Sequence, residues 1–301
     1  MLQAADVWFA YDKGTAVVRG VSLEISAEAF VGILGPNGSG KTTTLRLLAG
    51  TRQPQRGTVT LDGTPLSRLS RAALARRMAV VPQETHPAFD YTVLEVAMMG
   101  RYPHLGAFEI EGPQDVSIVE EALDATGTLN LKHRLFATLS GGEKQRVVIA
   151  AALAQVAPAT CAPASIENDH FRLKPEATKS VSRGFRLKAE EPRPGILLLD
   201  EPTASLDLAY QLEVAALLRR LHDERVVAVV LSTHDLNLAA SLCSTLVLIR
   251  DGAVLAAGAT DEVLTRDNVR RLYGVDADVM DHASGHRVIV PVRRISTGDR
   301  A

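Results

Sequence analysis

The stretch Gly35-Pro36-Asn37-Gly38-Ser39-Gly40-Lys41-Thr42 limits what this chain can fold into more than any other feature of its sequence. It follows a short apolar run, Phe30 to Leu34, and leads into a helical pattern that begins at Thr43. This is the pattern G-x-x-x-x-G-K-[ST] in the setting that it requires, between a strand and a helix. The glycines let backbone N–H groups come close to phosphate oxygens, and the helix start favours negative charge. We therefore expect a nucleotide here, with Lys41 near its β- and γ-phosphates and the hydroxyl of Thr42 on Mg²⁺.

Length and charge set outer limits on the kind of protein. With 301 residues the chain has room for one large α/β domain or two small ones. Lys plus Arg (33) nearly balances Asp plus Glu (35), so the overall charge implies no polyanionic partner such as nucleic acid. No apolar run approaches the roughly 18 residues of a membrane helix, and we expect no secretory signal. The two cysteines, Cys161 and Cys243, lie far apart, which fits a reducing cytosol. We expect any membrane role to come through a partner.

The chain divides into regions of different character, which we expect to belong to one domain. Strand patterns dominate residues 1–84 and recur between 140 and 260, which together predict a nucleotide-binding core. Residues 85–139 are mainly helical and predict a helical subdomain. Residues 157–195 are rich in Pro, Ala, Ser and charge without sustained periodicity, and we interpret them as a flexible surface insertion. The alternative for them is a basic patch that touches lipid or nucleic acid. Residues 261–301 are expected to add a C-terminal helix and strands.

Three local predictions are specific enough for a structure to test. Ser70 to Met78 has the pattern of a basic amphipathic helix. Thr260 is expected to cap a single helix that runs to about Tyr273. The tail from Val279 to Val292 is expected to supply one or two edge strands around a turn at Ser284-Gly285.

A second glycine-containing motif, Leu139-Ser140-Gly141-Gly142-Glu143, opens a long helical pattern. Ser140 followed three residues later by Glu143 is a capping box, in which each side chain hydrogen-bonds the other residue's backbone N–H. Gly141 and Gly142 in the first turn weaken a helix by roughly 1 kcal/mol each, so capping alone does not explain them. They make sense where the helix start must approach another group closely, and a phosphate suits both the open backbone and the helix dipole.

Several polar residues stand where predicted buried strands end, and in an α/β sheet that edge binds ligands. Asp200 and Glu201 follow an apolar run, and such a pair suits Mg²⁺ ligation plus a base for water. His234 follows the next buried strand, and we interpret it as functional rather than structural. Gln83 ends an earlier strand, where it is either a ligand group or a solvated strand-end residue. Tyr11 is either a stacking partner for adenine or a half-buried strand tyrosine.

Taken together, these residues resemble the motifs of the ATP-binding subunits of ABC transporters, and the resemblance covers almost the whole chain. It implies an α/β fold, with a P-loop NTPase core of the RecA-like kind, a mixed sheet, an antiparallel β subdomain and a helical signature subdomain. Six motifs occur in the family's order: the phosphate loop at Gly35 to Thr42, the glutamine-loop residue Gln83, the signature at Leu139 to Glu143, the Walker B end at Asp200 with Glu201 beside it, the D-loop at Ser205 to Asp207, and the switch histidine His234. Other phosphate-loop families lack the signature.

The resemblance also implies a mechanism of ATP hydrolysis. Two copies of the chain would pair head to tail and sandwich two ATP molecules, so that the signature residues Ser140, Gly141 and Gly142 of one copy face the ATP held by Gly35 to Thr43 of the other. The resemblance implies that Thr42, Gln83 and Asp200 bind Mg²⁺, directly or through water, and that Gln83 also takes part in catalysis. It implies that Glu201 is the general base and that His234 contacts the γ-phosphate. Tyr11 would stack on adenine.

The same resemblance implies partners and a place in the cell. Two transmembrane permease subunits would be moved through the region from Gln83 to His104, and a periplasmic substrate-binding protein would join the complex. The chain would sit on the cytoplasmic face of the bacterial inner membrane and bind no nucleic acid.

One segment narrows the choice of transporter. Met99-Gly100-Arg101-Tyr102-Pro103-His104 resembles the segment after the glutamine loop in importers of iron–siderophores, cobalamin and haem. Leu206 to Gln211 and the extra residues before Asp200 resemble the hemin importers of that group, although the insertion is longer than we expect even there. We therefore expect a hemin importer, with an iron(III)-siderophore or cobalamin importer as the alternative. A soluble ABC ATPase of translation or DNA repair would carry two ATP-binding units or a long coiled-coil insertion, and residues 101–104 argue against an exporter.

Overall fold

The computed structural model describes residues 1–295 except 13, 84, 86–88, 159–194, 205, 225–226 and 284. Its central element is a six-stranded sheet in the order β10-β9-β3-β8-β7-β6. The strands are β3 (Phe30–Leu34), β6 (Met78–Val81), β7 (Gly195–Asp200), β8 (Val227–Thr233), β9 (Thr245–Arg250) and β10 (Ala253–Ala259). Neighbouring strands are parallel except for the edge pair of β9 and β10. Every residue of β3 and β8 is buried, which explains why both read as apolar runs rather than as alternating patterns.

The carboxyl ends of β3, β6, β7 and β8 lie at one edge of this sheet because the four strands run in the same direction. Leu34 at the end of β3 is opposite Thr233 in β8, and Asp200 at the end of β7 is opposite Ser232 in β8. The segments that follow these strands therefore emerge side by side, which is where open α/β sheets bind ligands.

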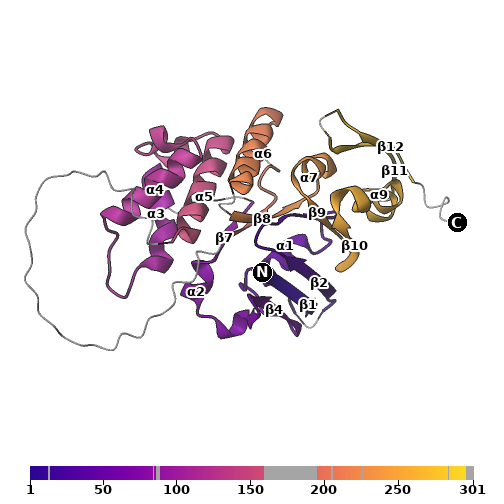
Figure 1. Ribbon diagram of the computed structural model, residues 1–301, viewed down its shortest axis with the longest axis horizontal. Helices are drawn as coiled ribbons and strands as arrows, with labels where there is room; N and C mark the ends of the chain where they lie inside the picture. The colour runs from indigo at the N-terminus through magenta and orange to yellow at the C-terminus, as the bar shows by residue number, and fades with distance from the viewer. Residues whose placement is uncertain are drawn as a thin grey trace, which may run out of the picture.

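A four-stranded antiparallel sheet, in the order β2-β1-β4-β5, covers one face of the central sheet. Its strands are β1 (Leu2–Phe9), β2 (Val18–Ile25), β4 (Arg56–Leu61) and β5 (Thr64–Pro65). Helix α1 (Lys41–Leu48) packs between the two sheets, and its Leu45, Leu47 and Leu48 belong to the core that both sheets share (Figure 1). The helix that follows the phosphate loop is thus held from both sides.

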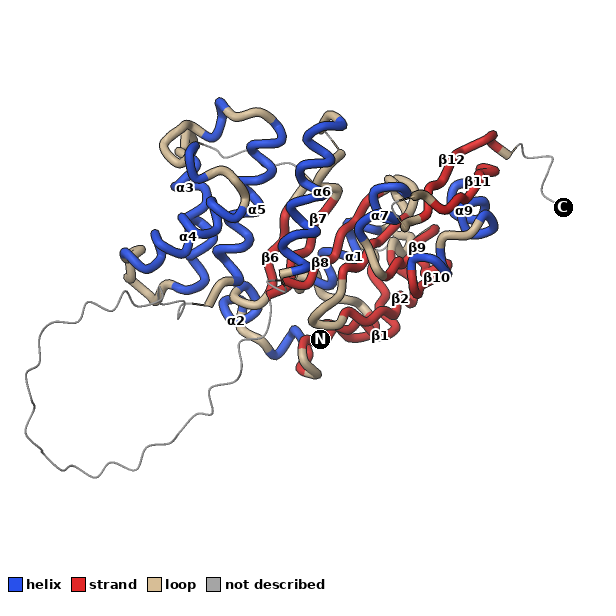
Figure 2. Tube along the Cα trace, turned by 45° about the horizontal axis from the view of Figure 1, so that its top comes forward, coloured by secondary structure: helices blue, strands red, loops and turns tan. Residues whose placement is uncertain are grey.

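Helices cover the other face of the central sheet. They are α3 (Val93–Met98), α4 (Pro113–Ala125), α5 (Gly141–Val156), α6 (Leu208–Asp223) and α7 (Leu236–Leu242), with 3₁₀ turns η2 (Met99–His104), η3 (Leu129–Leu131) and η4 (Phe136–Thr138). Alternate residues of a strand point to opposite faces, so Leu197 and Leu199 share a core with these helices while Ile196 and Leu198 face α1. α5 packs against α3 and α4, and the three form a group at one end of the molecule, next to α6 (Figures 1 and 2). Within the described residues, no helix has both the length and the apolar character to cross a bilayer.

Two of the local helix predictions are wrong in their limits. α2 (Arg71–Ala75) is shorter than the helix predicted from Ser70 to Met78, because Met78 begins β6 and pairs with Ile196 of β7. The single helix predicted from Thr260 is two helices, α8 (Thr260–Val263) and α9 (Arg266–Tyr273). The hydroxyl of Thr260 donates to the carbonyl oxygen of Cys243 instead of capping, and Thr265 caps α9 by accepting from the N–H of Asn268. The hairpin of β4 and β5 is followed by a 3₁₀ segment, η1 (Leu66–Arg68), which precedes α2.

The C-terminal strands do not extend the central sheet as its edge. β11 (Val275–Asp281) and β12 (Arg287–Arg294) form an antiparallel pair of their own, packed beside α7 and α9 (Figure 2). The side chain of Asn237 on α7 holds this pair in place, because its Nδ2 donates to the carbonyl oxygen of Ile289 at 3.2 Å and its Oδ1 accepts from the Ile289 N–H at 2.8 Å. The interpretation of residues 157–195 as an insertion falls almost wholly outside the described residues, as do Ser205 of the D-loop and Ser284.

Candidate functional site

The phosphate-loop stretch forms a tight turn between β3 and α1. Gly40 directly precedes α1 in a left-handed conformation (φ 103°), and a Cβ there would lie 2.8 Å from the carbonyl oxygen of Val17. At Gly35 a Cβ would lie 2.2 Å from the carbonyl oxygen of Ile249 in β9, so neither position accepts a side chain. Gly40 has no side chain with which to cap α1, and the N–H groups of the first helical turn remain for an anion in the loop.

The side chain of Lys41 lies inside this turn and is only 5% exposed. Its Nζ donates to the carbonyl oxygen of Gly35 at 2.9 Å and to that of Pro36 at 3.3 Å. The same nitrogen is 3.3 Å from Oε1 of Glu201. A buried ammonium group at the mouth of a loop of backbone donors is suited to phosphate oxygens.

The outer part of the loop is formed by Pro36, Asn37 and Gly38, of which Asn37 and Gly38 are exposed. Ser39 is buried, and its Oγ has no hydrogen-bond partner among the described residues. Buried hydroxyl groups are almost always hydrogen-bonded, so an orphaned one in this position fits a loop that binds an oxygen-rich ligand.

Thr42, Asp200 and Ser232 form a hydrogen-bonded cluster that joins α1, β7 and β8. Oδ1 of Asp200 accepts from Oγ1 of Thr42 at 3.0 Å and from Oγ of Ser232 at 2.6 Å. Ser232 is fully buried in β8, where the parallel register sets it opposite Asp200. Hydroxyl and carboxylate oxygens are the ligands that Mg²⁺ prefers, so Thr42 and Asp200 are suited to share one ion.

Glu201 occupies the next position and connects two other predicted site residues. Its backbone is left-handed (φ 46°), a strain of about 1–3 kcal/mol for a non-glycine residue, and its N–H donates to the carbonyl oxygen of Ser232 at 3.0 Å. Oε1 is near Lys41, while Oε2 is 3.2 Å from Nδ1 of His234. Glu201 is 14% exposed and His234 is 53% exposed. A carboxylate at the entrance of the site, between a cation and a histidine, is placed to accept a proton from water.

Tyr11 lies just after β1, with its hydroxyl close to the phosphate loop. This oxygen is 3.2 Å from Oγ1 of Thr43 and accepts from the Arg46 guanidinium at 3.2 Å, while Arg52 stands over the ring at 5.8 Å from its centroid. The hydrogen bond with Thr43, followed by the bond and charge of Arg46, lowers the pKa of Tyr11 against the opposing effect of partial burial. The ring packs with its edge on Phe9, and Tyr11 is 46% exposed.

Gln83 is exposed and lies two residues beyond the end of β6. Because β6 and β7 are parallel, it emerges at the sheet edge that also carries Asp200. This position agrees with the ligand interpretation, and the role of Gln83 stays a prediction.

The signature residues lie at the start of α5, and the predicted capping box is formed. The Glu143 N–H donates to Oγ of Ser140 at 3.3 Å, and the Ser140 N–H donates to Oε2 of Glu143 at 2.8 Å, which lowers the pKa of Glu143. Gly141 is exposed and Gly142 is buried. Among the described residues, no hydrogen bond joins this helix start to the phosphate loop. The predicted site residues therefore fall into two groups, one at the sheet edge and one at the start of α5.

Sequence comparison shows which family has this arrangement. The family model of the ABC transporter matches residues 18–161. The hemin import ATP-binding protein HmuV of Bordetella pertussis is 38% identical over 269 residues, which cover 89% of this chain and 90% of that protein. The chain belongs to the ABC ATPase family. The cobalamin import ATP-binding protein BtuD of Halobacterium salinarum is also 38% identical, over 280 residues, but the chain spans only 61% of its length.

Solved structures of ABC transporters have the same fold. A metal-chelate type ABC transporter in an inward-facing conformation superposes with a TM-score of 0.75 at 25% identity, over 97% of each chain. A dimeric bacterial ABC transporter cassette superposes with a TM-score of 0.63 at 25% identity, over 86% of this chain and 99% of that one. The predicted fold class, with its mixed sheet, antiparallel β unit and helical part, is confirmed, and so is the assignment of the chain as an ATP-binding protein of this family.

Two residues close to the ABC ATPase site were not predicted from the sequence. Ser232 stands in the stretch that leads to His234, and a small polar residue at the end of a fully buried strand was the signal that could have revealed it. Tyr273, at the end of α9, donates from its hydroxyl to the carbonyl oxygen of His234 at 3.3 Å. Burial, and after it the negative charges of Asp235 and Glu201, raise the pKa of Tyr273. No local pattern marks Tyr273, because it comes from a distant part of the chain.

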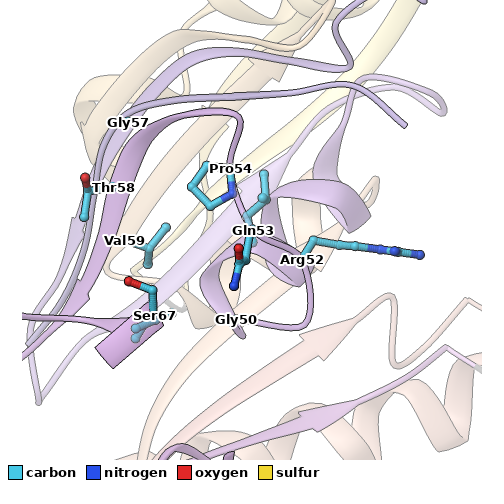
Figure 3. A pocket seen from close by; sticks show the side chains of 10 residues that line it. Gly50, Arg52, Gln53, Pro54, Gly57, Thr58, Val59 and Ser67 are labelled. Atoms are coloured by element: carbon cyan, nitrogen blue, oxygen red, sulfur yellow. The ribbon is translucent and has the colours of Figure 1, made fainter. Parts of the chain in front are cut away.

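A cavity of about 240 Å³ lies behind the other end of α1, away from the phosphate loop. Gly50, Pro54, Gly57 and Ser67 are among the residues that line it, and Arg52 extends outward from its rim (Figure 3). The cavity contains none of the predicted site residues of this ABC ATPase.

Proposed function

We propose that this ABC ATPase hydrolyses ATP to drive an importer, and that hemin is the compound imported. The hydrolytic part rests on one observation, namely that Glu201 contacts both Lys41 and His234 at the sheet edge where Thr42 meets Asp200. These side chains come from three segments, namely the start of α1, the end of β7 and the residues after β8. Together they include an anion-binding cation, a carboxylate base and a pair of oxygen ligands.

In the proposed reaction, Lys41 and the N–H groups at the start of α1 hold the β- and γ-phosphates of ATP. Glu201 accepts a proton from a water molecule whose oxygen bonds to the γ-phosphorus, while the bond between that phosphorus and the β–γ bridging oxygen breaks. The products are ADP and phosphate. ATP competes with Glu201 for the ammonium group of Lys41, so nucleotide binding frees Oε1 for the water. His234, beside Oε2, is the residue proposed to contact the γ-phosphate.

Mg²⁺ fits the donor set at this edge. Oγ1 of Thr42 and Oδ1 of Asp200 are 3.0 Å apart, and Gln83 emerges from the neighbouring strand as the third proposed ligand, directly or through water. When bound, the ion supplies positive charge that neutralises the phosphate oxygens. The ring of Tyr11, which is partly exposed, is proposed to stack on adenine.

A second copy of the chain completes the site in this proposal. Ser140 and Gly142 lie with Gly141 at the start of α5, apart from the sheet edge, so within one copy the signature does not serve the phosphate loop that precedes it. The helix start is suited to the γ-phosphate of an ATP held by the other copy. The likeness to a dimeric cassette supports a head-to-tail pair.

The proposed transport role requires partners in the membrane. Large apolar side chains, most of them aromatic, are exposed in the region that follows Gln83, and aromatic side chains are enriched where proteins bind one another. They are Phe89, Tyr102, Phe108 and Ile110. We propose that two transmembrane permease subunits dock here, that a periplasmic substrate-binding protein delivers the substrate, and that the chain sits on the cytoplasmic face of the inner membrane.

Hemin is preferred over cobalamin because the chain spans a larger share of the hemin relative's length. The hemin and cobalamin relatives are equally similar at 38% identity, but the chain spans 90% of the hemin relative and 61% of the cobalamin relative. An iron(III)-siderophore importer is the remaining alternative.

The transporter reconstituted in vesicles with its permease tests the proposal. ATP hydrolysis would be measured with hemin, an iron(III)-siderophore or cobalamin supplied on the outer side. Hemin alone is expected to stimulate hydrolysis. If cobalamin alone stimulated hydrolysis, cobalamin would replace hemin as the proposed substrate. A chain that hydrolyses no ATP would overturn the proposed activity.

A further inference from the structure

We propose that Tyr210, on the first turn of α6, is a positioning residue for the signature. Its ring is placed to set the position of the start of α5 and to fix that helix start to the segment that follows Glu201. The inference rests on the proposed function, because it is there that the signature receives its role toward the ATP of a second copy.

The first step is the contact between Tyr210 and Gly142. A Cβ on Gly142 would lie 2.4 Å from Cδ1 and 2.7 Å from Cγ of the Tyr210 ring, and 3.0 Å from its Cβ. Such distances leave no room for any side chain at position 142 while the ring stays in place. The sequence pattern alone attributed this glycine to the approach of a phosphate, and the ring of Tyr210 is a second reason for it within the same chain.

The second step is that this contact belongs to a continuous seam between α5 and α6. At Gly141 a Cβ would lie 3.2 Å from Cδ2 of Leu206, just before α6. One turn after Gly142, Arg146 forms an ion pair with Glu213 at 2.5 Å. Gly141, Gly142 and Arg146 of α5 thus face, in this order, Leu206 just before α6 and then Tyr210 and Glu213 on α6.

The third step connects the seam to the catalytic edge. Tyr210 is fixed to its own segment, because its N–H donates to the capping oxygen Oδ1 of Asp207 at 3.1 Å. The next residue, Gln211, donates from Nε2 to the carbonyl oxygens of Thr203 at 3.2 Å and Leu206 at 2.9 Å. The N–H of Ala204 donates to the carbonyl oxygen of Glu201 at 3.2 Å. A chain of short contacts therefore leads from the proposed base to the ring that holds the signature.

The consequence is that the start of α5 cannot shift relative to the segment after Glu201 unless the ring of Tyr210 leaves Gly142. The signature is then presented to the second copy in an orientation set by the first copy's own catalytic edge. Misplacing a group that acts on the substrate by about 1 Å can lower the rate up to 10²-fold, so a fixed position of this helix start favours fast ATP hydrolysis.

The functional test compares Tyr210→Ala with the matched control Tyr210→Phe in the full chain. We expect Tyr210→Phe, which keeps the ring, to retain the ATPase kcat within about twofold. Tyr210→Ala is expected to lower kcat about tenfold or more. The Kd of ATP for the isolated subunit should stay unchanged, because the phosphate loop is untouched. Wild-type kcat in Tyr210→Ala would overturn the inference, and so would equal losses in both variants. Absent ATPase activity in the wild-type chain would instead count against the proposed function.

The packing test needs no activity and applies even if Tyr210→Ala lowers stability. In the presence of Tyr210, Gly142→Ala is expected to lower Tm by roughly 5 °C, as overpacking does. In the Tyr210→Ala background the same substitution should cost less than half as much. Gly141→Ala is the control, because its nearest neighbour is the flexible end of Leu206 and not Tyr210, and its effect on Tm should be the same in both backgrounds. An equal Tm penalty for Gly142→Ala in both backgrounds would overturn the inference.

Discussion

Arg101 offers the most quantitative prediction, because its guanidinium is almost completely buried at 1% exposure. Nε donates to Oδ1 of Asp115 at 2.9 Å, in the first turn of α4. The other arm of the guanidinium donates to the carbonyl oxygens of Ala154 at 2.6 Å and Ala157 at 3.0 Å, at the end of α5. One side chain thus holds η2, the start of α4 and the end of α5 together, and its charge suits the negative end of the α5 dipole.

The perturbation is Arg101→Met, which keeps most of the apolar stem and removes all three hydrogen bonds. Asp115 loses its cation and the two α5 carbonyl oxygens lose their donor. Removing one partner of a buried ion pair costs about 3–5 kcal/mol, and we expect the free energy of unfolding to fall by that amount at pH 7. For a chain of this size the corresponding fall in Tm is roughly 10 °C.

Thermal unfolding followed by circular dichroism measures this effect, with Lys132→Met as the matched control. Lys132 forms an ion pair with Glu120 at 2.7 Å, but the two side chains are 31% and 38% exposed, so its loss should cost no more than about 1 kcal/mol. If Arg101→Met lowered Tm no more than Lys132→Met, the reasoning from burial would be refuted.

The dependence on pH gives this prediction a second readout. Burial works to raise the pKa of Asp115, but the hydrogen bond from the Gly112 N–H and the bond and charge of Arg101 outweigh it, and the pKa lies below its ordinary value. A carboxyl with a lowered pKa in the folded state stabilises the fold above the ordinary Asp pKa of about 3.9, and that stability is lost as the pH falls through the lowered value. The stability difference between wild type and Arg101→Met should therefore narrow below about pH 4. A difference that stays constant or widens there would contradict the assignment to Asp115.

Three further predictions concern the ATP site. Glu201→Gln should still bind ATP but release phosphate at least about 100-fold more slowly, and near-normal turnover would exclude Glu201 as the base. Tyr11→Ala should weaken ATP binding by about 1–3 kcal/mol while Tyr11→Phe retains it, as measured by nucleotide titration; equal affinities would argue against stacking. Ser232→Ala removes the 2.6 Å bond to Asp200 and should cost about 1.5–3 kcal/mol of stability in thermal unfolding, whereas the exposed Ser244→Ala should cost little; matching Tm values for the two would contradict this.

Sequence patterns predicted the regular elements well where one physical cause dominated. The apolar run Phe30 to Leu34 is β3, and the capping box of Ser140 and Glu143 opens α5, because in each case one local cause acts on a short stretch. The prediction failed at Met78, where a helical pattern runs into a strand that only pairing with β7 stabilises. It failed again at Thr260, a plausible cap by residue type whose hydroxyl is used by the carbonyl oxygen of Cys243.

The segment Met99 to His104 also makes packing contacts that could not be inferred from its sequence. It identified a group of importers by resemblance, and in the structure it packs on the last two turns of α5. A Cβ on Gly100 would lie 2.2 Å from the carbonyl oxygen of Ala151, and a ring nitrogen of His104 is 2.8 Å from the carbonyl oxygen of Gln155. Together with the bonds of Arg101, these contacts fix the segment to the C-terminal part of α5.

The sequence by itself determined the kind of protein, because a phosphate loop, a capped helix start with two glycines, and carboxylates after buried strands each demand particular residue types at short spacings. Those demands are local, so they can be recognised along the chain. The tertiary structure alone decided which side chains meet: Glu201 with Lys41 and His234, Ser232 with Asp200, and Tyr210 with Gly142. These contacts join segments that are distant in sequence, and the pairing of strands and the packing of helices bring them within a few ångströms.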